Sequence, residues 1–331
     1  MDRNRAQSKA KIGWRGGGNA ASNLRPAAMS ALTVFSPAKL NLTLAVTGRR
    51  ADGFHELVSL VAPVDCGDEL VVRPAAAGFT LACDDPTVPV DGSNLVLKAA
   101  AAFVAATGWR GGAHFTLTKR TPIGAGLGGA SSNAAMALSA LNRLAGDPLA
   151  ADALATVAAQ VGSDCALFLA GGPVIMRGRG ERIEPLTAAE RARLTGRRVL
   201  IFKPAFGIAT PWAYARLAAC ARATEAGAAS PADYVPAAEA EARLAAWRRN
   251  PAARLEELLH NSLEAPVGGK FLALPVLLEE LRRRFGLACR MSGSGSACFA
   301  LLPAAAPVAD ITAVIRGAWG PEVWLREAKL L

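Results

Sequence analysis

The chain has 331 residues, of which 52% are hydrophobic and 19% charged, and its formal net charge at pH 7 is +10. This length allows two domains with a sizeable core, and the composition excludes a disordered protein. No apolar stretch approaches the roughly 20 residues that a membrane helix requires, so we expect no membrane partner.

The first 30 residues carry half of the excess positive charge. They contain six basic residues and one acidic residue, which leaves a net charge of +5 for residues 31–331. The segment is rich in Gly, Asn and Ser and has no hydrophobic stretch, so it predicts a disordered basic tail over residues 1–30 and not a secretory signal. Its arginines also fit a transit peptide, which would place the protein in the plastid stroma. The modest excess in the body suits an enzyme with polyanionic ligands and does not require nucleic acid.

The cysteines and histidines give no sign of a metal site or a disulfide framework. The six cysteines form no C-x-x-C pair and lie in apolar runs. They predict reduced, buried thiols and therefore a cytoplasmic protein. The three histidines show no clustered spacing, so the metal ligands, if there are any, stay unknown at this point.

The residue pattern of the first half of the chain predicts strands followed by helices. Alternating apolar residues predict two short strands around Pro37 within residues 31–46. An Ala-rich helix is predicted over Leu95–Ala106, and two more helices follow residue 129. Further strands are predicted over residues 57–64, 69–73, 79–83 and 113–119, and a hairpin over residues 173–185.

The composition changes near residue 186, which divides the body into predicted domains over residues 31–185 and 186–331. The second half has a β-α-β-loop-β-α-β order, which favours an α+β fold. Its strands are predicted over residues 199–203, 287–291, 297–302 and 322–328, and its principal helices over residues 274–285 and 308–315.

A glycine-rich loop that runs directly into an apolar helix is the most informative segment. Its four glycines allow backbone N–H groups to approach an anion closely, and the helix N-terminus adds partial positive charge. The two serines are predicted to be N-cap hydroxyls. A flexible linker would not lie between a β-like run and an apolar helix. The loop therefore predicts a phosphate site made of Pro122, Ile123, Gly124, Ala125, Gly126, Leu127, Gly128, Gly129, Ala130, Ser131 and Ser132.

Two common phosphate-binding folds do not fit this loop. A P-loop ends in Gly-Lys-Ser/Thr, whereas this loop closes with Gly-Gly-Ala-Ser-Ser and has no lysine. A dinucleotide fold requires a second strand and an acidic residue after the helix, but a second helical pattern follows here. Both classes are therefore excluded.

Three motifs now stand in order: Pro37–Asn41, Pro122–Ser132 and Ser292–Ser296, the last a second glycine loop. Their order and spacing resemble the GHMP kinase superfamily. Within it, the segments Ser36–Leu42, Arg50–Glu56 and Val161–Phe168 resemble most the 4-diphosphocytidyl-2-C-methyl-D-erythritol kinases of the non-mevalonate isoprenoid pathway.

The resemblance implies an α+β fold with two domains and the active site between them. The N-terminal half would be similar to ribosomal protein S5 domain 2, and the C-terminal half would be ferredoxin-like. It implies that ATP, together with Mg²⁺, phosphorylates the 2-hydroxyl of a CDP-linked methylerythritol and gives ADP. The expected partner is this small molecule, with no nucleic acid and no membrane, and the expected state is a monomer or weak homodimer.

The resemblance also implies two catalytic residues. Asp164 would be the general base that accepts the proton of the substrate hydroxyl; from position alone it could equally be a helix N-cap. Lys39 would pair with Asp164 and orient the hydroxyl, although from position alone it is an ordinary strand lysine.

For the acceptor, the resemblance assigns Asn41 and His55 to the erythritol and cytidine sides. Phe54 stands where the family usually has a tyrosine, which preserves a ring for stacking on cytosine. Tyr214 is either the second stacking ring or a core residue. The second glycine loop either lies near the acceptor phosphates or is only a structural turn; the residues concerned are Ser292, Gly293, Ser294 and Gly295.

Two questions stay open around the nucleotide. Mevalonate-kinase-like members carry a helical glutamate as metal ligand, but residues 131–144 contain no acid. Ser131, Ser132, water and phosphate oxygens are then the available ligands for Mg²⁺. Before the loop, Lys119 or Arg120 either assists phosphate binding or is an exposed charge at the end of a strand.

Two other functions compete with this interpretation. One is a GHMP kinase for a small alcohol such as homoserine or a sugar, which needs no cytosine pocket of the kind that residues 50–55 predict. The other is a nucleic-acid-binding protein, suggested by the sequence pI near 9.8. The body has no aromatic–basic interleaving of the kind that such proteins use.

Overall fold

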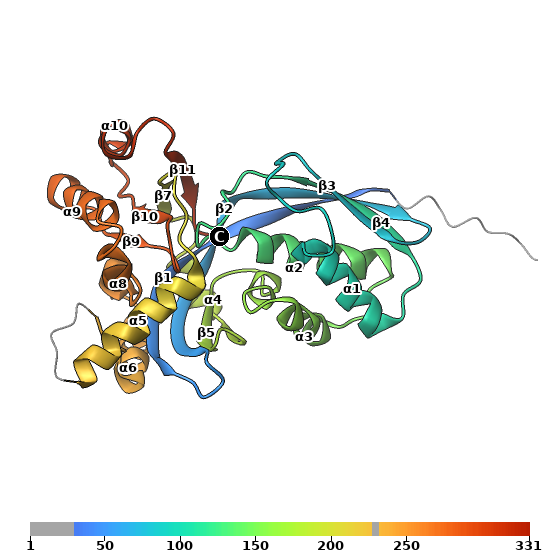
Figure 1. Cartoon of the computed structure of the whole chain (residues 1–331), viewed down its shortest axis with the longest axis horizontal. Helices are drawn as coiled ribbons and strands as arrows, with labels where there is room; N and C mark the ends of the chain where they lie inside the picture. Colours follow the sequence, from blue (N-terminus) through green and yellow to red (C-terminus); the bar gives the residue numbers. More distant parts are fainter. Residues whose placement is uncertain (1–29, 227–231) are drawn as a thin grey trace, which may run out of the picture. The chain divides into compact units, whose positions relative to one another are not determined.

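The computed structural model of this chain describes residues 30–226 and 232–331. Residues 31–331 form one compact unit. The predicted basic tail, with the exception of Ser30, lies outside the described residues. The predicted α+β class is confirmed, because helices pack on the faces of two separate sheets (Figure 1). Among the described helices none is both long and apolar enough to cross a membrane.

The larger sheet has seven strands among the described residues, and five of them run in the order β3-β4-β2-β1-β8. β5 pairs with β2, and β6 pairs with β5. β8 comes from far along the chain and pairs with β1 in parallel. The strands are β1 (Leu32–Arg49), β2 (His55–Ala75), β3 (Phe79–Cys83), β4 (Gly112–Thr118), β5 (Val174–Gly178), β6 (Arg182–Pro185) and β8 (His260–Asn261).

The prediction of two short strands around Pro37 is wrong, because β1 is a single strand that passes through the proline. Pro37 pairs with Gly67, and a register shift follows it, between Pro37 and Lys39, so the strand pairs with β2 on both sides of this irregularity. The two runs predicted at residues 57–64 and 69–73 likewise form one strand, β2. Gly67 joins them, where a Cβ would lie 2.1 Å from the Ser36 carbonyl oxygen.

Three helices cover one face of this sheet: α1 (Leu95–Thr107), α2 (Gly129–Leu144) and α3 (Ala151–Val161) (Figure 1). Asn94 begins α1, since its side chain accepts a hydrogen bond from the backbone N–H of Val96 at 2.9 Å. α2 is buried on almost all sides because it lies between the sheet and the other two helices. Its many alanines allow this close approach.

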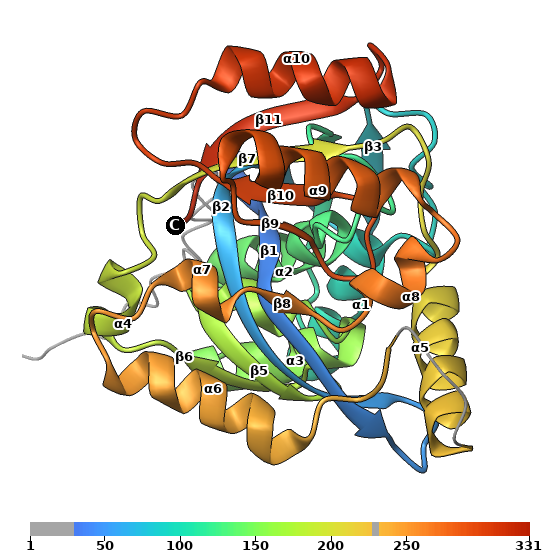
Figure 2. The same ribbon diagram turned by 90° about the vertical axis from the view of Figure 1, so that its left-hand side faces the viewer.

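The smaller sheet is antiparallel, in the order β11-β7-β10-β9, which is the ferredoxin-like arrangement. Its strands are β7 (Arg198–Lys203), β9 (Cys289–Met291), β10 (Cys298–Leu301) and β11 (Trp324–Lys329). α9 (Ala273–Phe285) and α10 (Val308–Trp319) lie over one face of it (Figure 2). The other described helices are η1 (Ala166–Leu169), α4 (Ala188–Ala192), α5 (Thr210–Glu225), α6 (Ala237–Arg249), α7 (Leu255–Leu258) and α8 (Glu264–Gly268).

Successive side chains along the strands of the smaller sheet point to opposite faces, and this alternation explains how the two sheets pack together. Val199, Ile201 and Phe299 share a buried cluster with Leu40 and Leu42 of β1. The residues between them point the other way and pack with α9 and α10, namely Leu200, Phe202, Cys298 and Ala300. The smaller sheet is therefore buried on both faces. The domain boundary after residue 185 stays a prediction.

The two glycine loops meet main chain to main chain where the sheets come together. The Ala297 N–H donates to the Ala125 carbonyl at 3.0 Å, and Ser292 Oγ donates to the Gly126 carbonyl at 3.2 Å. The Lys39 N–H donates to the Leu127 carbonyl at 2.9 Å, which adds β1 to the same junction. Three segments far apart in sequence are thus held at one point.

This junction predicts different costs for two alanine substitutions in the first loop. Gly124 and Gly126 both have positive φ, +62° and +77°. Alanine at either position costs about 1–2 kcal/mol of backbone strain. At Gly126 the new Cβ would also lie 2.2 Å from the Ser292 carbonyl oxygen, whereas at Gly124 the space is open. In urea unfolding we expect Gly126→Ala to be clearly less stable than the control Gly124→Ala; equal stabilities would contradict the close contact.

Candidate active site

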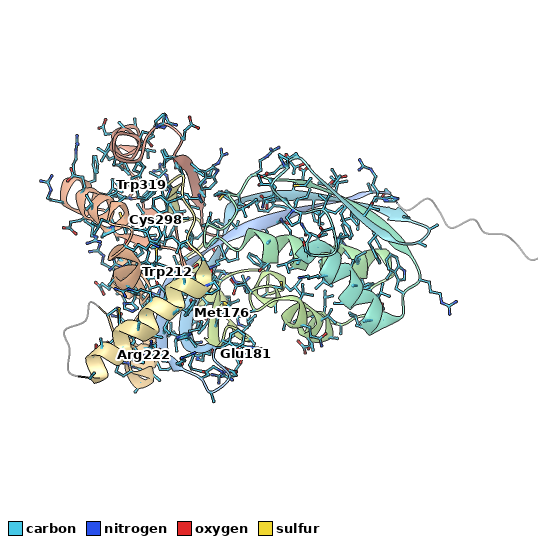
Figure 3. All side chains as sticks on the ribbon, viewed as in Figure 1. Met176, Glu181, Trp212, Arg222, Cys298 and Trp319 are labelled. Carbon is cyan, nitrogen blue, oxygen red and sulfur yellow. The ribbon has the colours of Figure 1, made fainter. Side chains whose placement is uncertain are left out.

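A cavity of about 920 Å³ lies at the junction of the two glycine loops, β1 and α5. Nearly all residues predicted for the site line it, and the exceptions are Ser132, Ser292 and Gly295. Segments that the sequence analysis did not single out complete the wall, including residues 87–89 and 93–95, which precede and begin α1. Met176 of β5 and Arg222 of α5 are two further wall residues, labelled in Figure 3.

Lys39 and Asp164 meet in this cavity as predicted. Lys39 Nζ lies 3.9 Å from Asp164 Oδ2, and the two side chains are 6% and 40% exposed. Lys39 comes from β1 and Asp164 from the turn between α3 and η1. Burial lowers the pKa of Lys39, and the charge of Asp164 opposes that effect. The result is a fixed amine behind an accessible carboxylate.

The surroundings of Lys39 hold it in place. Its ammonium donates to Asn41 Oδ1, and Asn41 Nδ2 donates to Ser59 Oγ at 2.9 Å. A Cβ at Gly128 would lie 3.0 Å from Lys39 Cγ, and a Cβ at Gly293 would lie 3.3 Å from Lys39 Nζ. Both glycine loops therefore close over the lysine, and glycine is what lets them do so.

The first glycine loop has the backbone that a phosphate site needs. Gly124, Gly126 and Gly128 adopt positive φ, and α2 begins immediately afterwards with Gly128 as N-cap. No side chain caps this helix, so its first N–H groups remain available to an anion. The loop lines the cavity next to this helix N-terminus, and its phosphate-binding role stays a prediction.

The N-cap role predicted for Ser131 and Ser132 is wrong. Left-handed Gly128 starts the helix earlier, so both serines lie within its first turns. Ser132 is fully buried and does not line the cavity, whereas Ser131 does. Ser132 therefore cannot contact a phosphate directly.

A buried carboxylate that the sequence analysis missed anchors this loop. Asp68 of β2 accepts hydrogen bonds from the N–H groups of Arg120 and Thr121, both at 2.8 Å, and from Lys119 Nζ. It also accepts one from Asn133 Nδ2 of α2 at 3.1 Å. Burial alone would raise the pKa of Asp68, but the Lys119 charge and these bonds hold it below the usual value. Asp68 thus fixes the start of the loop to the start of α2.

Lys119 and Arg120 have different surroundings. Lys119 lines the cavity and its ammonium is bound to Asp68, while the Arg120 side chain is 62% exposed and lies 3.9 Å from Asp84. Of the two predicted candidates, only Lys119 faces the cavity. Its charge lies beside the loop, where a Cβ at Gly129 would be 3.3 Å from Lys119 Nζ.

The predicted aromatic cluster is present in the wall of the cavity. The His55 and Tyr214 rings have centroids 5.0 Å apart, and Phe54, which is half exposed, lines the same cavity. His55 Nε2 is buried and has no hydrogen-bond partner among the described residues. Burial, and then the nearby Arg49 charge, lower the pKa of His55, so its ring is neutral at pH 7. The cluster therefore offers a ring surface and an unused polar edge.

The second glycine loop contributes only two of its four predicted residues to the wall of the cavity. Gly293 and Ser294 line the cavity, and Ser294 Oγ lies 2.7 Å from Thr210 Oγ1 at the start of α5. Ser292 and Gly295 do not line it, because they pack behind the wall against Gly126. The predicted substrate contact of these two residues is therefore replaced by a structural one.

Asn261 of β8, which no sequence motif marks, also fixes the second glycine loop. Its Nδ2 donates to the Met291 carbonyl at 2.7 Å and to the Gly293 carbonyl at 2.8 Å. The parallel pairing of β8 with β1 therefore links this loop to the strand that carries Lys39.

Comparisons with known proteins agree with this geometry. The GHMP kinases N terminal domain matches residues 94–172, and the GHMP kinases C terminal domain matches residues 243–319. The chain is 35% identical over 301 residues to the 4-diphosphocytidyl-2-C-methyl-D-erythritol kinase of Methylacidiphilum infernorum, covering 90% of this chain and 96% of that protein. It is 40% identical over 274 residues to the enzyme of the same name from Synechococcus sp., covering 82% and 87%.

A solved structure points the same way. The crystal structure of a 4-(cytidine 5'-diphospho)-2C-methyl-D-erythritol kinase superposes with a TM-score of 0.65 at 32% identity, covering 90% of this chain and 99% of that one. The predicted two-domain GHMP kinase fold is thereby confirmed.

The Asp68 network predicts a pH-dependent loss of stability on Asp68→Asn. This change leaves the Lys119 ammonium without its partner and should lower the free energy of unfolding by about 3–5 kcal/mol at pH 7. A carboxyl with a lowered pKa stabilises the fold above its unfolded pKa of about 3.9, and this contribution disappears as the pH falls through the lower folded value. The gap between wild type and variant should therefore narrow below about pH 4 in urea unfolding.

The double variant Asp68→Asn/Lys119→Met is the control, since it removes both partners. It should recover part of the lost stability. If Asp68→Asn alone had no effect at pH 7, the anchoring role would be refuted.

Proposed function

Since the chain belongs to the GHMP kinases, and within them to the 4-diphosphocytidyl-2-C-methyl-D-erythritol kinases, we propose that it transfers the γ-phosphate of ATP to the 2-hydroxyl of 4-diphosphocytidyl-2-C-methyl-D-erythritol. The products are the 2-phosphate and ADP, and the reaction belongs to the non-mevalonate isoprenoid pathway. One observation carries the proposal: a single cavity holds a phosphate-binding loop, an aromatic cluster and the Lys39–Asp164 pair.

Asp164 lies where it can act on both substrates. Its Oδ2 faces Lys39 beside the glycine loops, and its Oδ1 is directed toward Gly180, where a Cβ would lie 3.9 Å away. An alcohol held against Asp164 donates its proton to the carboxylate as phosphorus approaches the oxygen. The Lys39 ammonium lies 3.9 Å from this carboxylate and places a positive charge beside the reacting groups. This suits a loose phosphoryl transfer, which depends more on position and charge than on early proton removal.

The nucleotide is held by backbone and by one cation. The N–H groups of residues 124–129 bind the ATP phosphates, and Lys119 adds positive charge beside them. Asn133 lines the same region, and its buried Oδ1 has no hydrogen-bond partner among the described residues. That oxygen fits a Mg²⁺ ion that arrives with the nucleotide and keeps water and phosphate oxygens as its other ligands. When bound, the ion neutralises phosphate charge.

The acceptor is recognised at the aromatic end. Phe54 and Tyr214 offer ring faces to cytosine, and the neutral His55 has a free Nε2 for the edge of the base. A kinase for homoserine or a simple sugar has no use for such a cluster, which favours the cytidine-linked acceptor. No specific observation favours the nucleic-acid-binding alternative. A cytoplasmic location and a monomer or weak homodimer stay predictions.

Measuring ADP release with a panel of alcohols tests the proposal directly. We expect turnover with the CDP-linked methylerythritol and none above background with homoserine, mevalonate or galactose. Free methylerythritol should also fail, because it lacks the group that the aromatic cluster holds. Equal turnover of a small alcohol would refute the assignment of the acceptor.

Replacing the proposed base tests the mechanism. Asp164→Asn should lower kcat by about 10²–10⁴ while KM for ATP stays close to that of the wild type, because the phosphate loop is untouched. Asp310→Asn on the exposed side of α10 is the matched control and should be near normal. Near-normal kcat in Asp164→Asn would remove Asp164 from the reaction.

A further inference from the structure

Two arginines beside the aromatic cluster differ from their neighbours in having no carboxylate partner. Arg50 binds Asp52 and Glu56, and Arg177 binds Glu184 and Glu241. Arg182 binds Glu56 as well. By contrast, Arg49 and Arg179 line the cavity, and neither forms an ion pair with any residue that the structure describes.

These two arginines flank the proposed path of the acceptor. Arg49 ends β1 and is the direct cross-strand partner of His55. The Arg179 guanidinium lies 5.2 Å from the centre of the Phe54 ring. The residue after Arg179 is Gly180, which approaches Asp164. The backbone of Arg179 therefore adjoins the residue beside the proposed base, while its guanidinium lies beside Phe54.

Two carboxylates interact with Arg179 without forming an ion pair with its guanidinium: Glu181 accepts the Arg179 main-chain N–H at 2.7 Å, and Asp52 is held by other donors. The charge of Arg179 contributes to the lowered pKa of Asp52, but Asp52 accepts hydrogen bonds from Arg50 Nε at 3.1 Å and from the Phe54 N–H at 3.1 Å. Arg179 thus lines the cavity with a guanidinium that forms no ion pair among the described residues. Guanidinium groups with free donors match the paired oxygens of phosphates, which they bind through two hydrogen bonds at once.

We propose that Arg49 and Arg179 bind the diphosphate that joins cytidine to the alcohol, and that they make the enzyme select nucleoside diphosphate-linked acceptors. The proposal rests on the function proposed above. With cytosine at the aromatic cluster and the reacting hydroxyl at Asp164, the diphosphate must lie between them, and Arg179 has its guanidinium beside Phe54 and its backbone next to Gly180, which approaches Asp164. Nothing else in that part of the described wall carries a positive charge without a partner, except Arg222.

Arg222 is not part of this assignment. It lies two turns beyond Tyr214 on α5, about 12 Å further along the helix and away from Thr210, which contacts the second glycine loop. Figure 3 shows Trp212 and Arg222 toward opposite ends of this helix. Arg222 therefore faces the outer end of the cavity.

Titration calorimetry with cytidine, CMP and CDP tests the proposal without requiring turnover. Wild type should bind CDP most tightly of the three. Arg179→Gln should weaken CDP binding about tenfold, the loss expected for one charge-assisted contact, and change cytidine binding less than twofold. Arg49→Gln should act in the same direction. In steady-state assays both variants should raise KM for the CDP-linked acceptor and leave kcat and KM for ATP close to wild type.

Arg326→Gln is the matched control, because Arg326 is an exposed arginine of β11 outside the cavity. It removes the same charge and should leave all three affinities unchanged. If Arg49→Gln and Arg179→Gln bound CDP as tightly as wild type, or if they weakened cytidine and CDP equally, the diphosphate assignment would be wrong. If wild type itself bound neither cytidine nor CDP, the proposed function would fail first, so the two failures are distinguishable.

Discussion

The contact between the main chains of the two glycine loops is the constraint on which the rest of the site depends. Gly126 lies so close to Ser292 that no side chain fits between them, and this approach brings both loops over Lys39. Without it, the lysine of β1 would be an ordinary exposed strand residue. With it, the buried Lys39 ammonium lies beside the first glycine loop and 3.9 Å from Asp164 in the same cavity.

Buried charge near the first glycine loop is balanced locally, and the two cases, Lys39 and Asp68, have different consequences. The Lys39 ammonium has Asn41 as a close partner and Asp164 at a longer distance, so the carboxylate keeps its exposure and its freedom to meet an alcohol. Asp68 instead has a full set of donors and no exposed surface, so it acts on the shape of the loop alone. The proposed base is thus the acid with few partners, and Asp68 is the acid with many, so their degree of hydrogen bonding distinguishes them.

The sequence predicted the parts of the site that are local in the chain. The glycine loop, the helix after it and the neighbourhood of Phe54 and His55 follow from spacing and residue type within a few positions. Asp68 could not be found in this way, because its partners lie 51 to 65 positions further along the chain and it looks like any polar residue of a strand. The continuity of β1 through Pro37 was also hidden, since only pairing with β2 shows that a register shift directly after the proline keeps the strand in one piece. Arg49 and Arg179 indicate an anion site only once the structure shows that the neighbouring carboxylates are bonded to other groups.

A single cavity is lined by the first glycine loop, by the aromatic cluster and by Asp164. A single synthetic molecule that joins an adenosine polyphosphate to a cytidine group could therefore occupy both ends at once. Its two halves would each raise the effective concentration of the other, so its affinity would exceed that of either fragment. The linker between the halves would have to pass the Lys39–Asp164 pair. The distance between the first glycine loop and the aromatic cluster therefore sets the length of the linker.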